Sequence, residues 1–340
     1  MNKTSILIPT CSIYINVWEP HLKLLKKYWN DCLFKIFLGT DKNFDSNKLG
    51  LEKNYDIEYI FTDLPSKGDN ILNRIQFYLK KIKEKKFEIV LLLIDDFFLV
   101  RNVNNKDIFE CIQLMTKDSN IGALRLHPSP PGKKGSFYKN IKFEGQFPHI
   151  KIGEEYRDPI CSHCLDKLYK PPPNIFLPHL YADLDDKNIK NIHIKKNSIK
   201  LFKVNNTVVQ PTFWNINFLM NIINNLLYPN NNIRNLILNK KLDVKRKDLI
   251  LFEVIGGKIK SNKYILCPEK RNDIIYPTRG FCGGGIFRGI ASKWVIQLMK
   301  KEKIEFIVDN KNCVFNRKKY NSDFDNYLKG KSAKYADKII

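Results

Sequence analysis

Apolar runs and amphipathic segments alternate along the first 125 residues. Residues 5–9, 34–38 and 57–61 are short apolar runs with the length of β-strands, whereas residues 19–29 and 71–82 carry apolar side chains at helical spacing, with Asp69 placed as an N-cap. The segment from Phe87 to Ile94 is apolar at almost every position, which is typical of a strand buried on both faces. We therefore predict an α/β fold with a Rossmann-like, mostly parallel central sheet flanked by helices.

The pattern changes after residue 125 and divides the rest of the chain into three parts. Residues 126–205 contain proline clusters and short polar and aromatic pieces without a period, which predicts an irregular insertion covering the site. Regular structure returns in residues 206–300, where Trp214, Phe218 and Ile222 share the apolar stripe of a helix expected over 208–227. Gly283, Gly284 and Gly285 predict a flexible loop. Residues 301–340 turn polar, and we expect a C-terminal appendage of partial order.

The composition is strongly basic, with 58 Lys and Arg against 35 Asp and Glu and a formal net charge of +23. A basic surface can bind nucleic acid by releasing counterions from phosphates. Here the lysines are spread along a chain rich in Asn and Ile, with no arginine-rich stripe, as an AT-rich genome such as that of a large DNA virus would encode. This dispersion favours solvated faces over a nucleic-acid interface, and it leaves peripheral contact with an acidic membrane surface open.

No apolar stretch reaches the roughly 20 residues that span a bilayer, and the first residues lack a signal-peptide core, so we expect a cytoplasmic protein, or a virion protein if the source is viral. The eight cysteines show no disulfide spacing, which agrees with a reducing compartment. Cys161 and Cys164 form one metal-ligand pair. A zinc site would need two more ligands, which only the fold could bring, either Cys267 and Cys282 or His149 and His179.

The acidic pair Asp95 and Asp96 directly follows the most apolar run of the chain. An unpaired carboxylate inside a buried strand costs several kcal/mol, so the pair should lie where the strand emerges, at the edge where α/β sheets bind ligands. Carboxylate oxygens there suit Mg²⁺ or Mn²⁺ bridging to a diphosphate. Because neighbouring strand residues point to opposite faces, we expect one of the two to bind directly and the other to orient the surroundings. The alternative is a polar pair at an ordinary strand end.

Four segments resemble GT-A glycosyltransferases when taken in chain order. Residues 90–99, Val-Leu-Leu-Leu-Ile-Asp-Asp-Phe-Phe-Leu, resemble the family's DxD-like turn, especially in a set that reads roughly LLLxEDYFL. Residues 6–11 followed by 18–20 resemble its opening, and residues 210–214, Gln-Pro-Thr-Phe-Trp, resemble its Q-P-A-I-W segment. Phe252 and Glu253 resemble the end of its S-P-W-E-F-E motif. The departures are an Asp-Asp pair in place of Glu-Asp and the loss of the Trp-containing start of the last motif.

The resemblance implies a GT-A fold and transfer of a sugar from a nucleoside-diphosphate sugar to a glycan, protein or lipid acceptor. Residues 1–125 would be the nucleotide-sugar-binding half and residues 206–300 the acceptor-side half. Asp96, assisted by Asp95, would hold Mn²⁺ or Mg²⁺ on the diphosphate.

Further roles follow from the strand ends and from the same resemblance. Thr10, Thr40 and Asp41 follow the first two strands and could contact the nucleoside, the alternative being ordinary loop polarity. Arg74 could face the phosphates or solvent.

Two residues belong to the acceptor side in this interpretation. Glu253 is the candidate general base of an inverting reaction, because a carboxylate among apolar neighbours is suited to accept a proton near neutrality. A salt bridge at a strand edge is its alternative. Trp214 could stack on a sugar or belong to the core.

Two other function classes stay open. A metal-dependent nucleotidyltransferase also uses paired carboxylates, although the sequence has no phosphate-binding glycine motif that we can place. A non-catalytic nucleic-acid-binding protein would account for the charge but not for Asp95 and Asp96.

Overall fold

The computed structural model describes residues 3–41, 55–65, 70–127, 192–193, 200–204, 207–240, 242–245, 248–268, 275–278, 286–287, 290–291 and 293–306. Within them, one sheet is built from β1 (Thr4–Pro9), β2 (Lys35–Asp41), β3 (Ile57–Thr62), β4 (Ile89–Leu92), β5 (Ile121–Arg125), β6 (Ile192–His193), β7 (Lys200–Val204), β8 (Thr212–Asn215) and β9 (Tyr264–Pro268). A separate antiparallel pair consists of β10 (Ile286–Phe287) and β11 (Ile290–Ala291). The helices are α1 (Ile15–Tyr28), α3 (Ile71–Glu84), α4 (Asn105–Lys117), α7 (Ile216–Leu227), α8 (Asn231–Asn239), α9 (Leu249–Ile255) and α10 (Lys293–Glu302), with 3-10 turns η1 (Ser12–Tyr14) and η5 (Gly256–Lys258).

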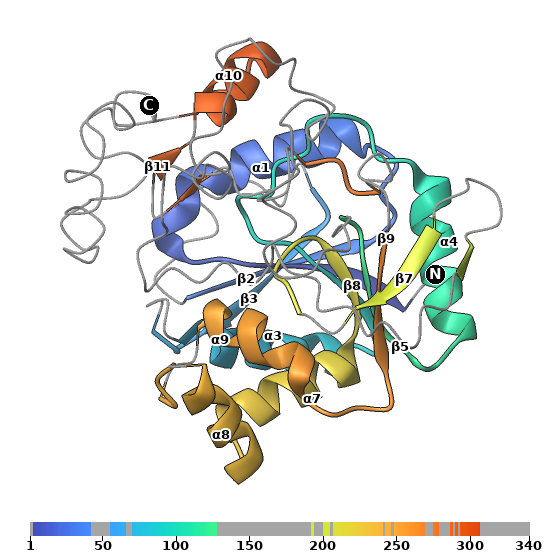
Figure 1. The fold of residues 1–340 in the computed structure, drawn as a ribbon. Helices are drawn as coiled ribbons and strands as arrows, with labels where there is room; N and C mark the ends of the chain where they lie inside the picture. Colours follow the sequence, from blue (N-terminus) through green and yellow to red (C-terminus); the bar gives the residue numbers. More distant parts are fainter. Residues whose placement is uncertain are drawn as a thin grey trace, which may run out of the picture.

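The strand order of the sheet is β3-β2-β1-β4-β8-β5-β9-β7-β6 (Figure 1). β3, β2, β1 and β4 run parallel to one another, and so do β5 and β9. β8 is antiparallel to both of its neighbours, β4 and β5. The predicted α/β fold, with a sheet flanked by helices and a parallel first half, is confirmed. β4 lies in the interior of the sheet, as the apolar run from Phe87 to Ile94 predicts, although the strand itself covers only Ile89–Leu92.

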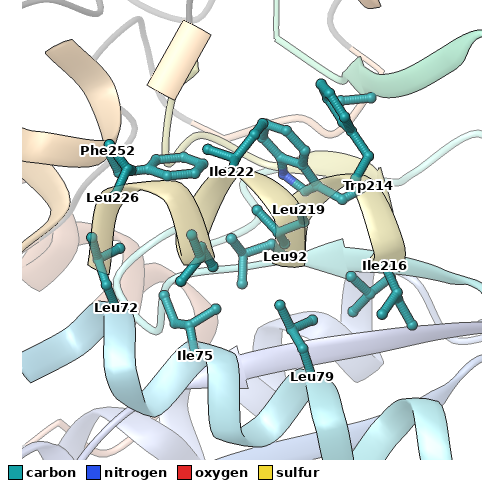
Figure 2. Packing of buried hydrophobic residues seen from close by; sticks show 14 of the residues in the cluster. Leu72, Ile75, Leu79, Leu92, Trp214, Ile216, Leu219, Ile222, Leu226 and Phe252 are labelled. Atoms are coloured by element: carbon teal, nitrogen blue, oxygen red, sulfur yellow. The ribbon is translucent and has the colours of Figure 1, made fainter. Parts of the chain in front are cut away.

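Helices cover both faces of the sheet because the strands are apolar on both sides (Figure 1). α1 and α4 pack on one face, and α3, α7 and α9 pack on the other. α10 packs on the outer side of α1 through Val295, Leu298 and Met299. Figure 2 shows side chains of α3 pointing towards α7 in the core on the α3, α7 and α9 face of the sheet. The labelled residues of this core are Leu72, Ile75, Leu79, Leu92, Trp214, Ile216, Leu219, Ile222, Leu226 and Phe252. The sheet is therefore the middle layer of three.

The predicted helix over 208–227 is wrong at its start. Residues 212–215 form β8, and α7 begins only at Ile216, where the Asn215 side chain caps it by accepting a hydrogen bond from the Phe218 N–H at 3.1 Å. Trp214 therefore lies on a strand and is completely buried. Its ring packs against Phe218 and Phe252, with centroids 6.1 and 5.7 Å away. This is the core position that the sequence left as the alternative to a sugar-stacking role.

A glycine on β2 lets α3 pack directly on the end of that strand. A Cβ at Gly39 would lie 2.5 Å from ring atoms of Tyr78, so a larger residue there would push the helix away. The close packing places Arg74, one turn before Tyr78, at the carboxyl edge of the sheet.

Several sequence predictions lie outside the described residues. They concern the Asp69 cap, the Cys161 and Cys164 pair, the glycine-dense loop at 281–285, most of the insertion at 126–205, and residues 307–340. None of the helices in the described part of the chain is long and apolar enough to cross a membrane.

Candidate functional site

The carboxyl ends of β1 and β4 form the point where the strand order reverses. From β1 the chain adds β2 and β3 on one side and then β4 on the other, and α/β sheets bind ligands beside such a reversal. Thr10 follows β1, and Asp95 follows β4. The Thr10 hydroxyl accepts a hydrogen bond from the Trp18 Nε1–H at 2.8 Å, so its own proton is directed to Asp95 Oδ2, with which it is in contact. Thr10 and Asp95, 85 positions apart in the sequence, therefore meet at the point where the strand order reverses.

Arg74 of α3 is buried against the same place. Its guanidinium donates to the Thr10 carbonyl through Nη2 and to the Tyr78 hydroxyl through Nε at 3.3 Å. Burial raises the pKa of Asp95 to about 6, while the Thr10 hydrogen bond and the positive charge of Arg74 oppose that rise. Arg74 is 2% exposed, so the sequence alternative of a solvent-facing helix arginine is wrong.

His21 of α1 supports the turn that carries the two aspartates. Its Nδ1 lies 2.9 Å from the Asp95 carbonyl oxygen, which makes Nδ1 the protonated nitrogen. Burial lowers the pKa of His21 to about 4, and the hydrogen bond to Asp95 opposes this shift. The imidazole is therefore neutral at pH 7 and ties α1 to the end of β4.

Asp95 and His21 should make opposite contributions to the pH dependence of stability. Between about pH 4 and 6 the folded chain binds more protons at Asp95 than the unfolded chain, so the Asp95 contribution falls as pH rises. Between about pH 4 and 6.5 the folded chain binds fewer protons at His21, so its contribution rises with pH. We expect the two to offset each other in the natural protein.

Urea unfolding at pH 4, 5, 6 and 7 measures these contributions separately. Relative to the natural protein, Asp95→Asn should gain about 3 kcal/mol of unfolding free energy between pH 4 and 6, since each pKa unit corresponds to about 1.4 kcal/mol. His21→Asn keeps a donor for the Asp95 carbonyl and should lose about as much. Three parallel pH curves would contradict both shifts.

The end of β2 presents polar atoms to the same edge. Thr40 and Asp41 are buried, and Asp41 Oδ2 lies 3.4 Å from the Ser12 N–H. The Thr40 hydroxyl and Asp41 Oδ1 have no hydrogen-bond partner among the described residues. A buried polar atom left unpaired costs about 1–3 kcal/mol, so this position is suited to a hydrogen-bonding ligand or an ordered water.

Asp96 differs from Asp95 in its exposure. The turn at 94–97 is closed by a hydrogen bond from the Phe97 N–H to the Ile94 carbonyl at 3.1 Å, and Asp96 is partly exposed while Asp95 is buried. The described residues contain no group of three or more His, Cys, Asp or Glu side chains that could hold a metal by themselves. One accessible carboxylate fits a Mg²⁺ or Mn²⁺ ion that is held mainly by the phosphates of a substrate, and it does not fit a metal bound by protein side chains alone.

Glu253 lies on helix α9 and not at a strand edge. Its Oε1 accepts a hydrogen bond from the Val209 N–H at 3.3 Å, in the segment that leads into β8. Its negative charge also acts on Arg125, whose pKa is lowered by burial and held up by Cys267 and Glu253. The carboxylate thus faces the segment before β8 and a buried cation.

Arg125 and His127 lie at the end of β5 and are not among the site residues predicted from the sequence. Arg125 is fully buried and donates from Nη2 to Gln210 Oε1 at 2.7 Å. His127 Nε2 lies 2.7 Å from the Thr278 hydroxyl and 2.9 Å from the Tyr276 carbonyl. The only sequence signal was an arginine ending the apolar run at 121–124, since all of these partners lie at least 85 positions away. These contacts join the end of β5 to residues that precede β8 and follow β9.

Comparisons with known proteins give no matching family model and no matching curated protein. Among solved structures, the chain is similar to 4-diphosphocytidyl-2C-methyl-D-erythritol synthase, with a TM-score of 0.28 and 10% identity over 40% of this chain and 66% of that one. It is also similar to S. aureus TarS, with a TM-score of 0.27 and 16% identity over 40% of each chain. The chain thus spans less than two thirds of either structure. We therefore argue the function from the residues of this chain.

Proposed function

We propose that this protein transfers a sugar from a nucleoside-diphosphate sugar to a glycan, protein or lipid acceptor, with the donor bound at the carboxyl edge of β2, β1 and β4. The observation that carries the proposal is the meeting of Thr10, Arg74 and Asp95 at the strand-order reversal. Beside them, the Thr40 hydroxyl and Asp41 Oδ1 are buried and have no hydrogen-bond partner among the described residues. A ligand with hydrogen-bond donors and a neighbouring anionic group suits this combination. A nucleoside diphosphate has both.

Each residue has a role that follows from its position. The Asp41 carboxylate accepts from a nucleoside N–H or O–H, and the Thr40 hydroxyl donates to or accepts from the same group. Arg74 fixes the Thr10 carbonyl, and its positive charge favours the diphosphate nearby. Asp96, the partly exposed member of the acidic pair, would hold Mn²⁺ or Mg²⁺ beside the diphosphate, and the ion would stabilise the charge of the leaving group.

Glu253 is proposed as the general base that deprotonates the acceptor hydroxyl in an inverting reaction. Its Oε1 accepts a hydrogen bond from the Val209 N–H, which supports the carboxylate from the segment before β8. Sugar transfer with inversion at the anomeric carbon would then release a nucleoside diphosphate as the second product.

Calorimetric titration of UDP and GDP in the presence and absence of Mn²⁺ tests the donor site. Thr40→Val and Asp41→Asn each remove hydrogen-bonding capacity without changing size, and we expect each to weaken nucleotide binding about threefold to thirtyfold. Thr116→Val makes the first change on α4, where the hydroxyl donates only to its own helix at Ile112, and should leave affinity unchanged.

Product analysis then separates the reaction classes. Release of a nucleoside diphosphate from a sugar nucleotide supports glycosyl transfer. Formation of pyrophosphate from a nucleoside triphosphate would instead support a nucleotidyltransferase, and equal nucleotide affinity in all four proteins would overturn the donor site.

A further inference from the structure

A pocket of about 400 Å³ opens at the edge of the sheet opposite to the proposed donor site. One wall is Tyr264 and Ile265 at the start of β9, and Tyr264 pairs with Ile121, the first residue of β5. Val204, the last residue of β7, pairs with Ile265. Because β5 and β9 begin at this edge, the pocket lies at the amino ends of the strands, whereas Thr10 and Asp95 follow the carboxyl ends of theirs. Its volume is in the range that small-molecule sites occupy.

The floor of the pocket is apolar. It is formed by buried side chains of β7, α7 and β9, namely Val204, Phe218, Ile222 and Ile265. Ile222, labelled on α7 in Figure 2, belongs to the core that joins α7 to α3. Apolar side chains therefore close the bottom of the pocket.

The rim of the pocket is cationic. Lys258, Lys260 and Lys263 line it, together with the main chain of Gly256 and Gly257, and no lining residue is acidic. Lys263 donates to the Ser119 carbonyl and keeps further ammonium protons for a ligand. This arrangement places positive charge over an apolar floor.

Tyr264, which forms part of the wall, also contacts one cation and one carboxylate that do not line the pocket. Lys203 Nζ lies 3.8 Å from the centroid of the Tyr264 ring. The Tyr264 hydroxyl donates to Asp118 Oδ2 at 2.5 Å, so this carboxylate is engaged by the wall and is not among the lining residues. Three of the residues that line the pocket are lysines.

We propose that this pocket binds a small amphiphilic anion, a molecule with one carboxylate or phosphate group on an apolar body. The anionic group lies among Lys258, Lys260 and Lys263, and the apolar body lies on the floor made by Phe218 and Ile222. The site is separate from the donor site, so binding at one does not require the other.

Isothermal titration of the full chain with decanoate tests the proposal, with decan-1-ol as the neutral analogue and inorganic phosphate as the charged group alone. We expect decanoate to bind at least tenfold more tightly than either, and to bind more weakly as salt is added. The variant Lys258→Glu/Lys260→Glu should weaken decanoate binding at least tenfold. The control Lys80→Glu/Lys83→Glu makes the same charge change on exposed residues of α3 and should bind as the natural protein does.

Several outcomes would overturn the site. One is that both double variants weaken decanoate binding equally, and another is that decanoate and decan-1-ol bind with equal affinity. A third is that the protein binds phosphatidylglycerol vesicles but not free decanoate, which would indicate contact with a membrane surface instead. The single variant Lys260→Glu changes an exposed residue and serves the same comparison if the double variant does not fold. Nucleotide titration of the same samples reports on the donor site independently, so failure of one proposal is distinguishable from failure of the other.

Discussion

Replacing Glu253 by glutamine should lower the turnover of sugar transfer by roughly two to four orders of magnitude. Glutamine keeps the shape of the side chain and an oxygen that can accept from the Val209 N–H, but it cannot take a proton from an acceptor hydroxyl. Nucleotide affinity should be unchanged, because Glu253 has no part in the proposed donor site. Steady-state kinetics with a sugar nucleotide and calorimetric titration of the nucleotide measure the two quantities.

A second variant separates catalysis from structure at this position. Glu253→Ala loses both the proton acceptor and the hydrogen bond to the segment before β8, so it should lower turnover as much as Glu253→Gln and also lower the free energy of unfolding. Glu84→Gln, an exposed change near the end of α3, is the control. If Glu253→Gln transfers sugar at the normal rate while Glu253→Ala is destabilised, the residue has only a structural role and the question of retention or inversion reopens.

Replacing Asp96 by alanine should remove the Mn²⁺ dependence of nucleotide binding, with a loss of affinity of a hundredfold or more in the presence of the ion. Asp96 is the partly exposed member of the acidic pair, and without its carboxylate the protein would no longer help to hold an ion at the diphosphate. The fold should persist because Asp96 is only partly buried, in a turn after β4. Calorimetric titration of UDP with and without Mn²⁺ is the measurement.

The control for Asp96 is Asp31→Ala, which removes an exposed carboxylate between α1 and β2, at the opposite edge of the sheet. It should bind nucleotide as the natural protein does, with the same Mn²⁺ dependence. An Asp96→Ala protein that keeps that dependence would remove the metal role from this residue.

The spacing of apolar residues within single segments predicted the parallel half of the fold, because the strands and helices there follow regular periods. The run from Phe87 to Ile94 is apolar at almost every position, which is typical of a strand covered on both faces, and β4 has that place. The acidic pair after it was expected to divide its roles. The structure buries Asp95 and leaves Asp96 partly exposed, although the metal role of Asp96 stays a prediction.

The run Thr212 to Asn215 shows where local pattern fails. These four residues, with aromatic and β-branched side chains, fit the beginning of a helical stripe as well as a strand. Pairing with β4 on one side and β5 on the other decides for the strand. The same pairing buried Trp214, which the sequence left between the core and a ligand contact.

The sequence by itself determined the α/β class, the interior position of the strand at 89–92 and the edge at which polar side chains gather, because these follow from the period and burial of single segments. Only the tertiary structure decided that Thr10 meets Asp95, that His21 supports the acidic turn and that Glu253 contacts Val209. Each of these pairs joins residues 44 to 85 positions apart, and such contacts depend on strand order and helix packing rather than on local spacing.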